Sequence, residues 1–147
     1  MRTLHYLAIL MKLSIGGLGG SLCAAILSLL VGGIAGFSLG LMRKVIAQVQ
    51  SEDYIWESLE FYGAITCASY GAIGGLIAGA VGLVTEKSSI GIFVGGLAGL
   101  ASMAFGLMLS GVPPAHWGVE GILAILGTTL GCALSGRIWA EIGQALR

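Results

Sequence analysis

The chain has 147 residues, of which 56% are hydrophobic and only 10% are charged, and its mean hydropathy is +0.98. A soluble domain carries about 25% charged residues, so this composition excludes an ordinary soluble fold and predicts an integral, multi-pass membrane protein. Seven basic and seven acidic residues give a net charge of zero, which provides no basic field to attract nucleic acid. We therefore expect membrane lipids and other membrane proteins as partners, and no nucleic acid.

Four stretches with little charge have the length that a bilayer requires, because a hydrocarbon core of about 30 Å takes roughly 20 helical residues. The predicted spans cover residues 14–42, 61–85, 89–111 and 118–138, with an outer loop at 43–60. The fourth span is short, but Trp117 and Trp139 flank it, and their separation of roughly 33 Å along a helix matches that of the two interfacial aromatic belts. The sequence thus predicts an all-α membrane protein with one transmembrane domain, a compact Gly-rich bundle of four helices.

The first of these stretches is longer than the membrane needs. Thirty uncharged residues separate Lys12 from Arg43, and they make about 45 Å of helix. Even a helix with the usual tilt of about 20° does not use that length within the hydrocarbon. We expect the ends of this helix to protrude, to bend or to lie in the interface.

The basic residues predict the orientation of the chain. Cytoplasmic segments of membrane proteins carry an excess of Lys and Arg. With the N-terminus inside, the inner segments hold Arg2, Lys12, Lys87, Arg137 and Arg147, against Arg43 and Lys44 outside. This count places both termini in the cytoplasm. Three tryptophans are expected to be interfacial anchors: Trp56 in the outer loop, and Trp117 and Trp139 at the two ends of the fourth span.

Small residues recur at every fourth position in each predicted span. These rows are Gly16, Gly20, Ala24, Ser28, Gly32, Gly36 and Gly40 in the first span; Gly63, Cys67, Gly71, Gly75 and Gly79 in the second; Gly91, Gly95 and Gly99 in the third; and Gly127 and Gly131 in the fourth. Lipid tails are as apolar as Leu, so helices in a membrane associate through close backbone approach, which small residues permit. We predict these rows as helix-packing residues. The alternative is that membrane helices are simply rich in glycine, which would explain their number but not their register.

Two short segments recur along the chain. "VGGIAG" at 31–36 returns as "VGGLAG" at 94–99, and "CASYGAI" at 67–73 is echoed by "CALSGRI" at 132–138. The two offsets are nearly equal, and they predict two duplicated helical hairpins in the same orientation, related by an axis along the membrane normal. Chance matches within Gly-rich sequence are the alternative explanation.

Residues that would support chemistry are scarce. No nucleophile or phosphate-binding motif has its proper context, and the three cysteines fall inside spans, where they are predicted to pack as small residues. We therefore expect no catalytic residue, no metal site and no cofactor, and hence no enzyme. His116 lies one helical turn before Glu120, a spacing that suits an interfacial polar pair. A haem or pigment bound by His5 or His116 is a less favoured alternative.

Three functions fit these features. The first is a structural or assembly subunit of a larger membrane complex or homo-oligomer, joined through small-xxx-small helix packing. The second is a small passive channel, facilitator or translocase-like pore subunit, since no charged residue lies at a span centre to couple transport to protons. In size, in number of spans and in its GxxxG rows the chain is similar to the inner-membrane translocase family, as an analogy of architecture only. The third is a cofactor-bearing membrane subunit.

Overall fold

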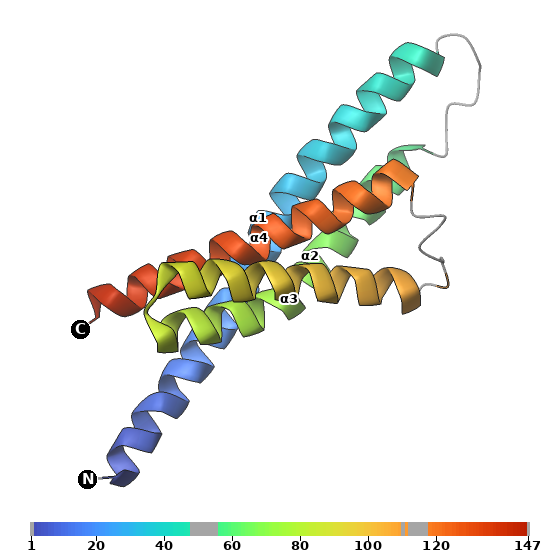
Figure 1. Cartoon of the computed structure of the whole chain (residues 1–147). Helices are drawn as coiled ribbons and strands as arrows, with labels where there is room; N and C mark the ends of the chain where they lie inside the picture. The colour runs from blue at the N-terminus through green and yellow to red at the C-terminus, as the bar shows by residue number, and fades with distance from the viewer. Residues whose placement is uncertain (1, 48–55, 110, 112–117, 147) are drawn as a thin grey trace.

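The computed structural model describes the backbone of residues 2–47, 56–109, 111 and 118–146, and the side-chain surroundings of residues 5–32, 34, 65–109, 111 and 121–146. Among these residues every regular element is an α-helix (Figure 1). The helices are α1 (Arg2–Ala47), α2 (Trp56–Thr85), α3 (Ser88–Leu109) and α4 (Gly118–Ala145). The predicted all-α four-helix bundle is therefore confirmed.

Each helix contains a segment long and apolar enough to cross a membrane. These segments are His5–Gly32, Ile65–Thr85, Ser88–Leu109 and Gly121–Ala145, with mean hydropathies between 1.5 and 2.0. None of the helices contains a proline, which would remove a backbone hydrogen bond. The four segments are compatible with a multi-pass membrane protein.

The helix ends differ from the predicted spans. α1 is continuous for 46 residues, so of the three expectations for its long apolar stretch the structure speaks only against a bend that breaks the helix. Helix also covers residues 43–47 and 56–60 of the predicted outer loop, and α4 continues past Ile138 to Ala145. In α4 the side chains of Arg137 and Glu141 pair across one turn at 2.8 Å, which supports helix past the end of the predicted span at 138.

The helices run alternately up and down and form two hairpins, α1 with α2 and α3 with α4. α1 packs on α2 and α4, and α3 packs on the same two helices. Figure 1 shows that α1 crosses the other helices obliquely and extends past them at its N-terminal end. The bundle core therefore lies along α2 and α4, with α1 and α3 as its outer members.

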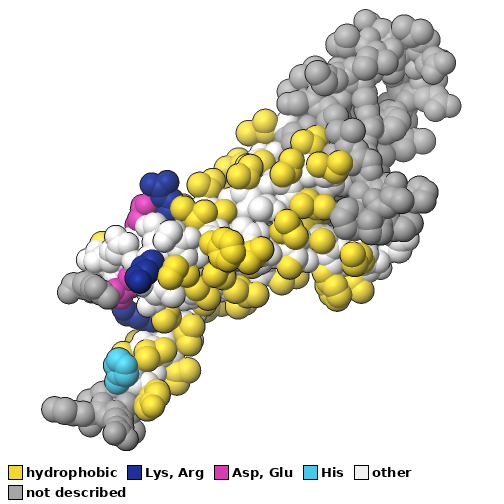
Figure 2. All heavy atoms as spheres, in the orientation of Figure 1, with side chains coloured by type: hydrophobic (Ala, Val, Ile, Leu, Met, Phe, Trp, Pro, Cys, Tyr) yellow, Lys and Arg dark blue, Asp and Glu magenta, His cyan; other side chains and the backbone are white. Residues whose placement is uncertain are grey.

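The described core consists mainly of small side chains, while most bulky apolar side chains lie on the surface. The bulkiest fully buried side chains are those of Met103, Thr128, Cys132, Ser28 and Ser135. Large apolar side chains instead cover the outside, as Figure 2 shows along the side of the bundle. Such a surface is stable where lipid, and not water, surrounds it.

Among the residues with described side chains, the charged ones gather at the end of the bundle that holds the turn between α2 and α3 (Figure 2). Lys12 of α1 forms a 2.6 Å ion pair with Glu86, which lies in the turn between α2 and α3, and Gln144 of α4 donates to the Glu86 carbonyl at 2.6 Å. Glu86 adopts a φ of 55°, the left-handed conformation that often ends a helix. This turn thus connects α2 to α3 and also bonds to α1 and α4, so all four helices meet there.

Candidate functional site: a small-residue core and the groove beside it

The contact between α1 and α2 is made by glycines from both helices. A Cβ atom added at Gly16 would lie 2.6 Å from the Gly79 carbonyl oxygen, and one added at Gly20 would lie 2.5 Å from the Gly79 Cα atom. A Cβ atom at Gly75 would lie 2.5 Å from the Gly20 carbonyl oxygen. Real Cβ atoms do not approach other atoms so closely, so only glycine fits these positions without a shift of the backbone. Backbone contacts backbone directly at this crossing.

The contact between α3 and α4 is built differently, with glycines mainly on one side. A Cβ atom at Gly95 would lie 2.9 Å from the Cys132 carbonyl carbon, and one at Gly99 would lie 2.7 Å from the Thr128 carbonyl oxygen. Among the described residues of this contact, glycine faces glycine only where Gly91 meets the Gly136 carbonyl. The glycines of α3 therefore rest against the main chain of Cys132 and Thr128.

Ser28 lies where α1, α2 and α4 meet. It is fully buried, and a Cβ atom added at Gly71 would lie 2.7 Å from the Ser28 Cβ atom, while one at Gly131 would lie 2.9 Å from the Ser28 backbone nitrogen. The Ser28 hydroxyl has no hydrogen-bond partner among the described residues. Its small volume therefore matters more to this junction than its polarity.

Side chains of α4 and α3 donate hydrogen bonds to the carbonyls of neighbouring helices. The Ser135 hydroxyl donates to the Gly20 carbonyl at 3.0 Å, and the Cys132 thiol donates to the Gly71 carbonyl at 3.4 Å. On α3, the Ser102 hydroxyl lies 3.0 Å from the Tyr70 carbonyl. Such bonds between membrane helices contribute about 0.6–2 kcal/mol each, so they fix the register of helices that the glycines bring together.

Most of the predicted packing residues lie at these contacts. All of those in the described surroundings are buried except Gly32, which is half-buried. The predictions for Gly36, Gly40, Gly63, Trp56 and Trp117 lie outside the residues whose surroundings the structure describes.

The sequence analysis missed a second small-residue row on α2. Gly74, Ala78 and Gly82 are buried, and Gly74 and Gly82 face α4: a Cβ atom at Gly74 would lie 2.8 Å from the Cys132 sulfur, and one at Gly82 would lie 3.2 Å from the Ala140 nitrogen. This row follows the first at an offset of three positions, which places it on an adjacent face of the helix. The spacing was readable in the sequence, but it did not indicate which row meets which helix.

Trp139, predicted as an interfacial anchor, packs between helices. Its indole covers Gly19 of α1, where an added Cβ atom would lie 2.9 Å from the Trp139 Cε2 atom. The indole nitrogen is buried and has no hydrogen-bond partner in the described part of the chain. The structure thus gives Trp139 a packing contact that the flanking-aromatic pattern did not suggest.

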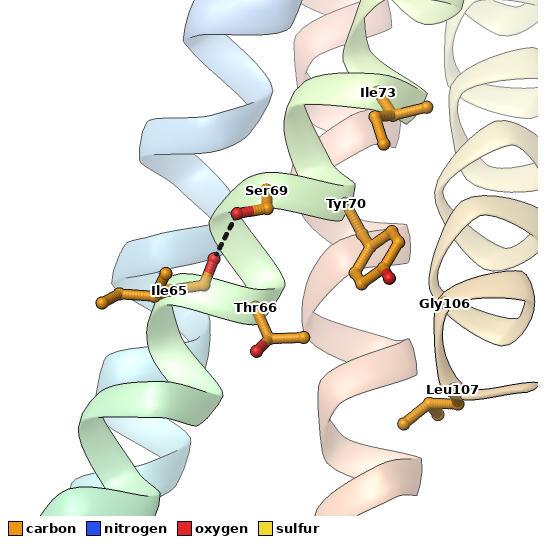
Figure 3. A pocket seen from close by; sticks show the side chains of 7 residues that line it. All are labelled: Ile65, Thr66, Ser69, Tyr70, Ile73, Gly106 and Leu107. Carbon is orange, nitrogen blue, oxygen red and sulfur yellow. Dashed lines mark hydrogen bonds between the residues drawn. The ribbon is translucent and has the colours of Figure 1, made fainter. Parts of the chain in front are cut away.

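A groove opens between α2 and α3 near the end opposite the charged cluster (Figure 3). Its volume is about 470 Å³, and its lining consists of Ile65, Thr66, Ser69, Tyr70, Ile73, Gly106 and Leu107. The Tyr70 ring occupies the space where Gly106 lacks a side chain. Three hydroxyl groups therefore lie in an otherwise apolar groove, which we call the α2–α3 groove.

The described residues contain no cluster of three or more His, Cys, Asp or Glu side chains that would suit a metal ion. His5 is exposed near the start of α1 and contacts the neighbouring Tyr6 ring edge to face at 6.4 Å. His116 and Glu120, named above for a cofactor or a polar pair, lie outside the described surroundings.

Together these contacts define the class of protein: an all-α bundle of four helices, each long and apolar enough to cross a membrane, packed through small residues. Comparisons of the chain with protein-family models, curated proteins and solved structures gave no match. The functional proposals below therefore depend on the geometry of this chain.

Proposed function

We propose that this protein is a non-enzymatic, multi-pass membrane protein that acts as a structural or assembly subunit of a larger membrane complex or homo-oligomer. The observation that carries the proposal is the start of α1. From Tyr6 to Met11 this helix precedes the ion pair of Lys12 with Glu86, and the side chains of Tyr6, Leu7, Leu10 and Met11 are 57–64% exposed. We call residues 5–11 the α1 overhang.

The α1 overhang is difficult to reconcile with an isolated bundle. Charged groups prefer the membrane boundary, so we propose that the Lys12–Glu86 pair lies at this boundary and that the first residues of the apolar segment His5–Gly32 extend beyond it. The helix is continuous through this level, so the overhang does not turn to lie flat on the headgroups. Exposed apolar side chains outside the hydrocarbon cost about 25 cal/mol for each Å² that contacts water. A partner that covers them would remove this cost.

The distribution of charge supports the predicted orientation. Lys12, Lys87 and Arg137 belong to the same end of the bundle, near the start of α1, the α2–α3 turn and the last turns of α4. An excess of Lys and Arg on one side is typical of cytoplasmic segments. We therefore propose that this end, with both termini, faces the cytoplasm.

The alternative function, a passive channel, facilitator or translocase-like pore subunit, has less support. A pore through the bundle would need its hydroxyl groups to line an opening. Ser28 instead fills the junction of three helices, and Ser135 is buried with its hydroxyl bonded to the Gly20 carbonyl. Measurement of ion or solute flux into liposomes that contain the purified protein would test this alternative.

The proposed function is tested by the mass of the native particle extracted in mild detergent. We expect a particle well above the 14.9 kDa of one chain. Changing Leu7 and Leu10 together to Ser should reduce the particle to one chain while the protein still inserts. The matched control changes Leu97 and Leu100, which are exposed to a similar degree on α3, and it should leave the particle intact. A wild-type particle with the mass of a single chain would overturn the proposal, as would equal behaviour of the two double variants.

A further inference from the structure

The α2–α3 groove lies beside the contacts that join the two helices. Toward the charged end they touch closely: a Cβ atom at Gly74 would lie 3.1 Å from the Ala98 carbonyl, and the Ser102 hydroxyl bonds to the Tyr70 carbonyl. Beyond Tyr70, whose ring lies on Gly106, the helices leave the groove open (Figure 3). Its volume of about 470 Å³ falls in the range of small-molecule sites, about 300–1,000 Å³.

The polar groups of the groove leave one hydrogen-bond donor unused. The Ser69 hydroxyl donates to the Ile65 carbonyl of its own helix at 2.9 Å, as Figure 3 shows. No hydrogen bond joins the Tyr70 hydroxyl to any of the described residues, although its ring is held in place by Gly106. A phenol surrounded by apolar side chains gains from an acceptor, because an unpaired polar group is costly away from water.

The depth of the groove indicates which acceptor is available. α3 has 22 residues and is therefore about 33 Å long, close to the thickness of the hydrocarbon core. Gly106 lies one turn before the end of α3 at Leu109, so the groove lies near the membrane boundary. Tyr side chains favour this level, and the ester carbonyls of membrane lipids lie there, next to the start of their acyl chains.

We propose that the α2–α3 groove binds one acyl chain of an ester-linked membrane lipid, with the ester carbonyl accepting a hydrogen bond from the Tyr70 hydroxyl and the chain passing over Ile73. The site depends on the membrane location of the bundle and is independent of the assembly role proposed above. The chemistry is binding alone, and no bond in the lipid is made or broken. Thr66 and Ser69 also line the groove.

The test compares two lipids that differ only at the proposed acceptor. The purified full-length chain is equilibrated in detergent with equal amounts of a diacyl phospholipid and its dialkyl ether counterpart, which has the same headgroup and chain length but no carbonyl. Native mass spectrometry then measures the lipid that each chain retains. One neutral hydrogen bond contributes about 1 kcal/mol, so the wild type should retain the ester lipid about fivefold more than the ether lipid.

Two pairs of variants separate the groove from general lipid contact. Tyr70→Phe removes the hydroxyl and should abolish the preference for the ester lipid, whereas Tyr6→Phe makes the same change on α1 and should preserve it. Ile65→Trp should fill the groove and lower total retention of both lipids, whereas Ile92→Trp, at a site of similar exposure outside the groove, should not. Circular dichroism checks that each variant keeps its helices.

Three outcomes would overturn the site. They are equal retention of the two lipids by the wild type, a preference that persists in Tyr70→Phe, and equal effects of the two tryptophan variants, which would indicate non-specific lipid contact only. None of these results depends on the native particle mass. A failure here and a failure of the proposed assembly role are therefore distinguishable.

Discussion

The two hairpins of this bundle share an internal register but differ in how much helix they bring together. Ser28 lies against Gly71 in the first hairpin, and Gly91 lies against Gly136 in the second. The offset from Ser28 to Gly91 equals that from segment 31–36 to segment 94–99. The offset from Gly71 to Gly136 equals that from segment 67–73 to segment 132–138. However, α3 begins at Ser88, so the part of α1 before residue 25 has no counterpart in the second hairpin. This additional helix supplies the Gly16 and Gly20 contacts and the α1 overhang.

The contacts between the hairpins do not repeat. Ser135 of α4 donates to Gly20 of α1, but Tyr70, the α2 residue equivalent to Ser135, contacts Ser102 and Gly106 of α3. If the two hairpins were exact repeats, Tyr70 would contact the residue that corresponds to Gly20. By the offset between the recurring segments that residue is Leu83, which lies on α2 itself and not on α3. The hairpins are thus shifted along each other relative to a simple two-fold arrangement. The spacing of small residues sets the register of the two helices within a hairpin. The register between the two hairpins depends instead on the shapes of whole helix faces.

The largest expected effect is at the glycine crossing of the first hairpin. Gly79→Leu would drive a side chain into the backbone at Gly16 and Gly20, and we expect a loss of more than about 3 kcal/mol in the free energy of unfolding. Reversible unfolding in mixed micelles measures it. Gly96→Leu is the control, because a Cβ atom there has no neighbour closer than 3.9 Å. Equal losses for the two variants would refute the close contact of α1 with α2.

A smaller effect is expected at the crossing of the second hairpin. Gly95→Ala places a methyl group against the Cys132 carbonyl, which should cost about 1–3 kcal/mol of unfolding free energy, because α3 contacts α4 with glycine on one side and can shift outward. Gly96→Ala, one residue along the same helix, should be neutral or slightly stabilising through its helix propensity. Should Gly95→Ala be as damaging as Gly79→Leu, the two crossings would be equally rigid and the contrast between the hairpins would fail.

Two serines test how the hairpins are joined. Ser135→Ala removes the hydrogen bond to the Gly20 carbonyl and should lower the unfolding free energy by about 1 kcal/mol. Ser28→Ala removes a buried hydroxyl that has no partner among the described residues, so stability should stay the same or rise. Thermal or denaturant unfolding of the two variants in one detergent compares them directly. The opposite order would show that Ser28, and not Ser135, makes the hydrogen bond that joins the hairpins.

The smallest effect is expected at the charged end, for the exposed pair of Arg137 with Glu141. Lys12→Met removes the ion pair that holds α1 at the Glu86 turn. The Lys12 side chain is 40% exposed but that of Glu86 only 8%, so the loss should exceed that of a surface pair, which is about 1 kcal/mol or less, and high salt should reduce it. Arg137→Met breaks the fully exposed pair with Glu141 and should change stability less. Measurement of the unfolding free energy at low and high ionic strength separates the two variants. A loss for Lys12→Met that does not depend on salt would mean that the packing of the Lys12 side chain, and not its charge, stabilises the bundle.

Much of the fold was predictable because the apolar length of a helix and the spacing of its small residues can be read from its own segment of the sequence. The apolar stretches between charged residues located the four helices, and the row through Gly71, Gly75 and Gly79 marked a face of α2 that contacts α1. The second row, through Gly74 and Gly82, was not recognised as a face for α4. The groove at Tyr70 was also missed, because Tyr70 and Gly106 come together only when α2 and α3 are docked.

The sequence by itself determined the class of protein, the number of helices and the positions where backbones can approach, because hydrophobicity and the helical period are properties of short segments. Only the tertiary structure decided which row meets which helix, why Ser28 sits between Gly71 and Gly131, and how far α1 extends past its neighbours. The physical reason is that small residues permit close approach without selecting a partner. The choice depends on the fit of several helix faces at once, and no single segment carries that information.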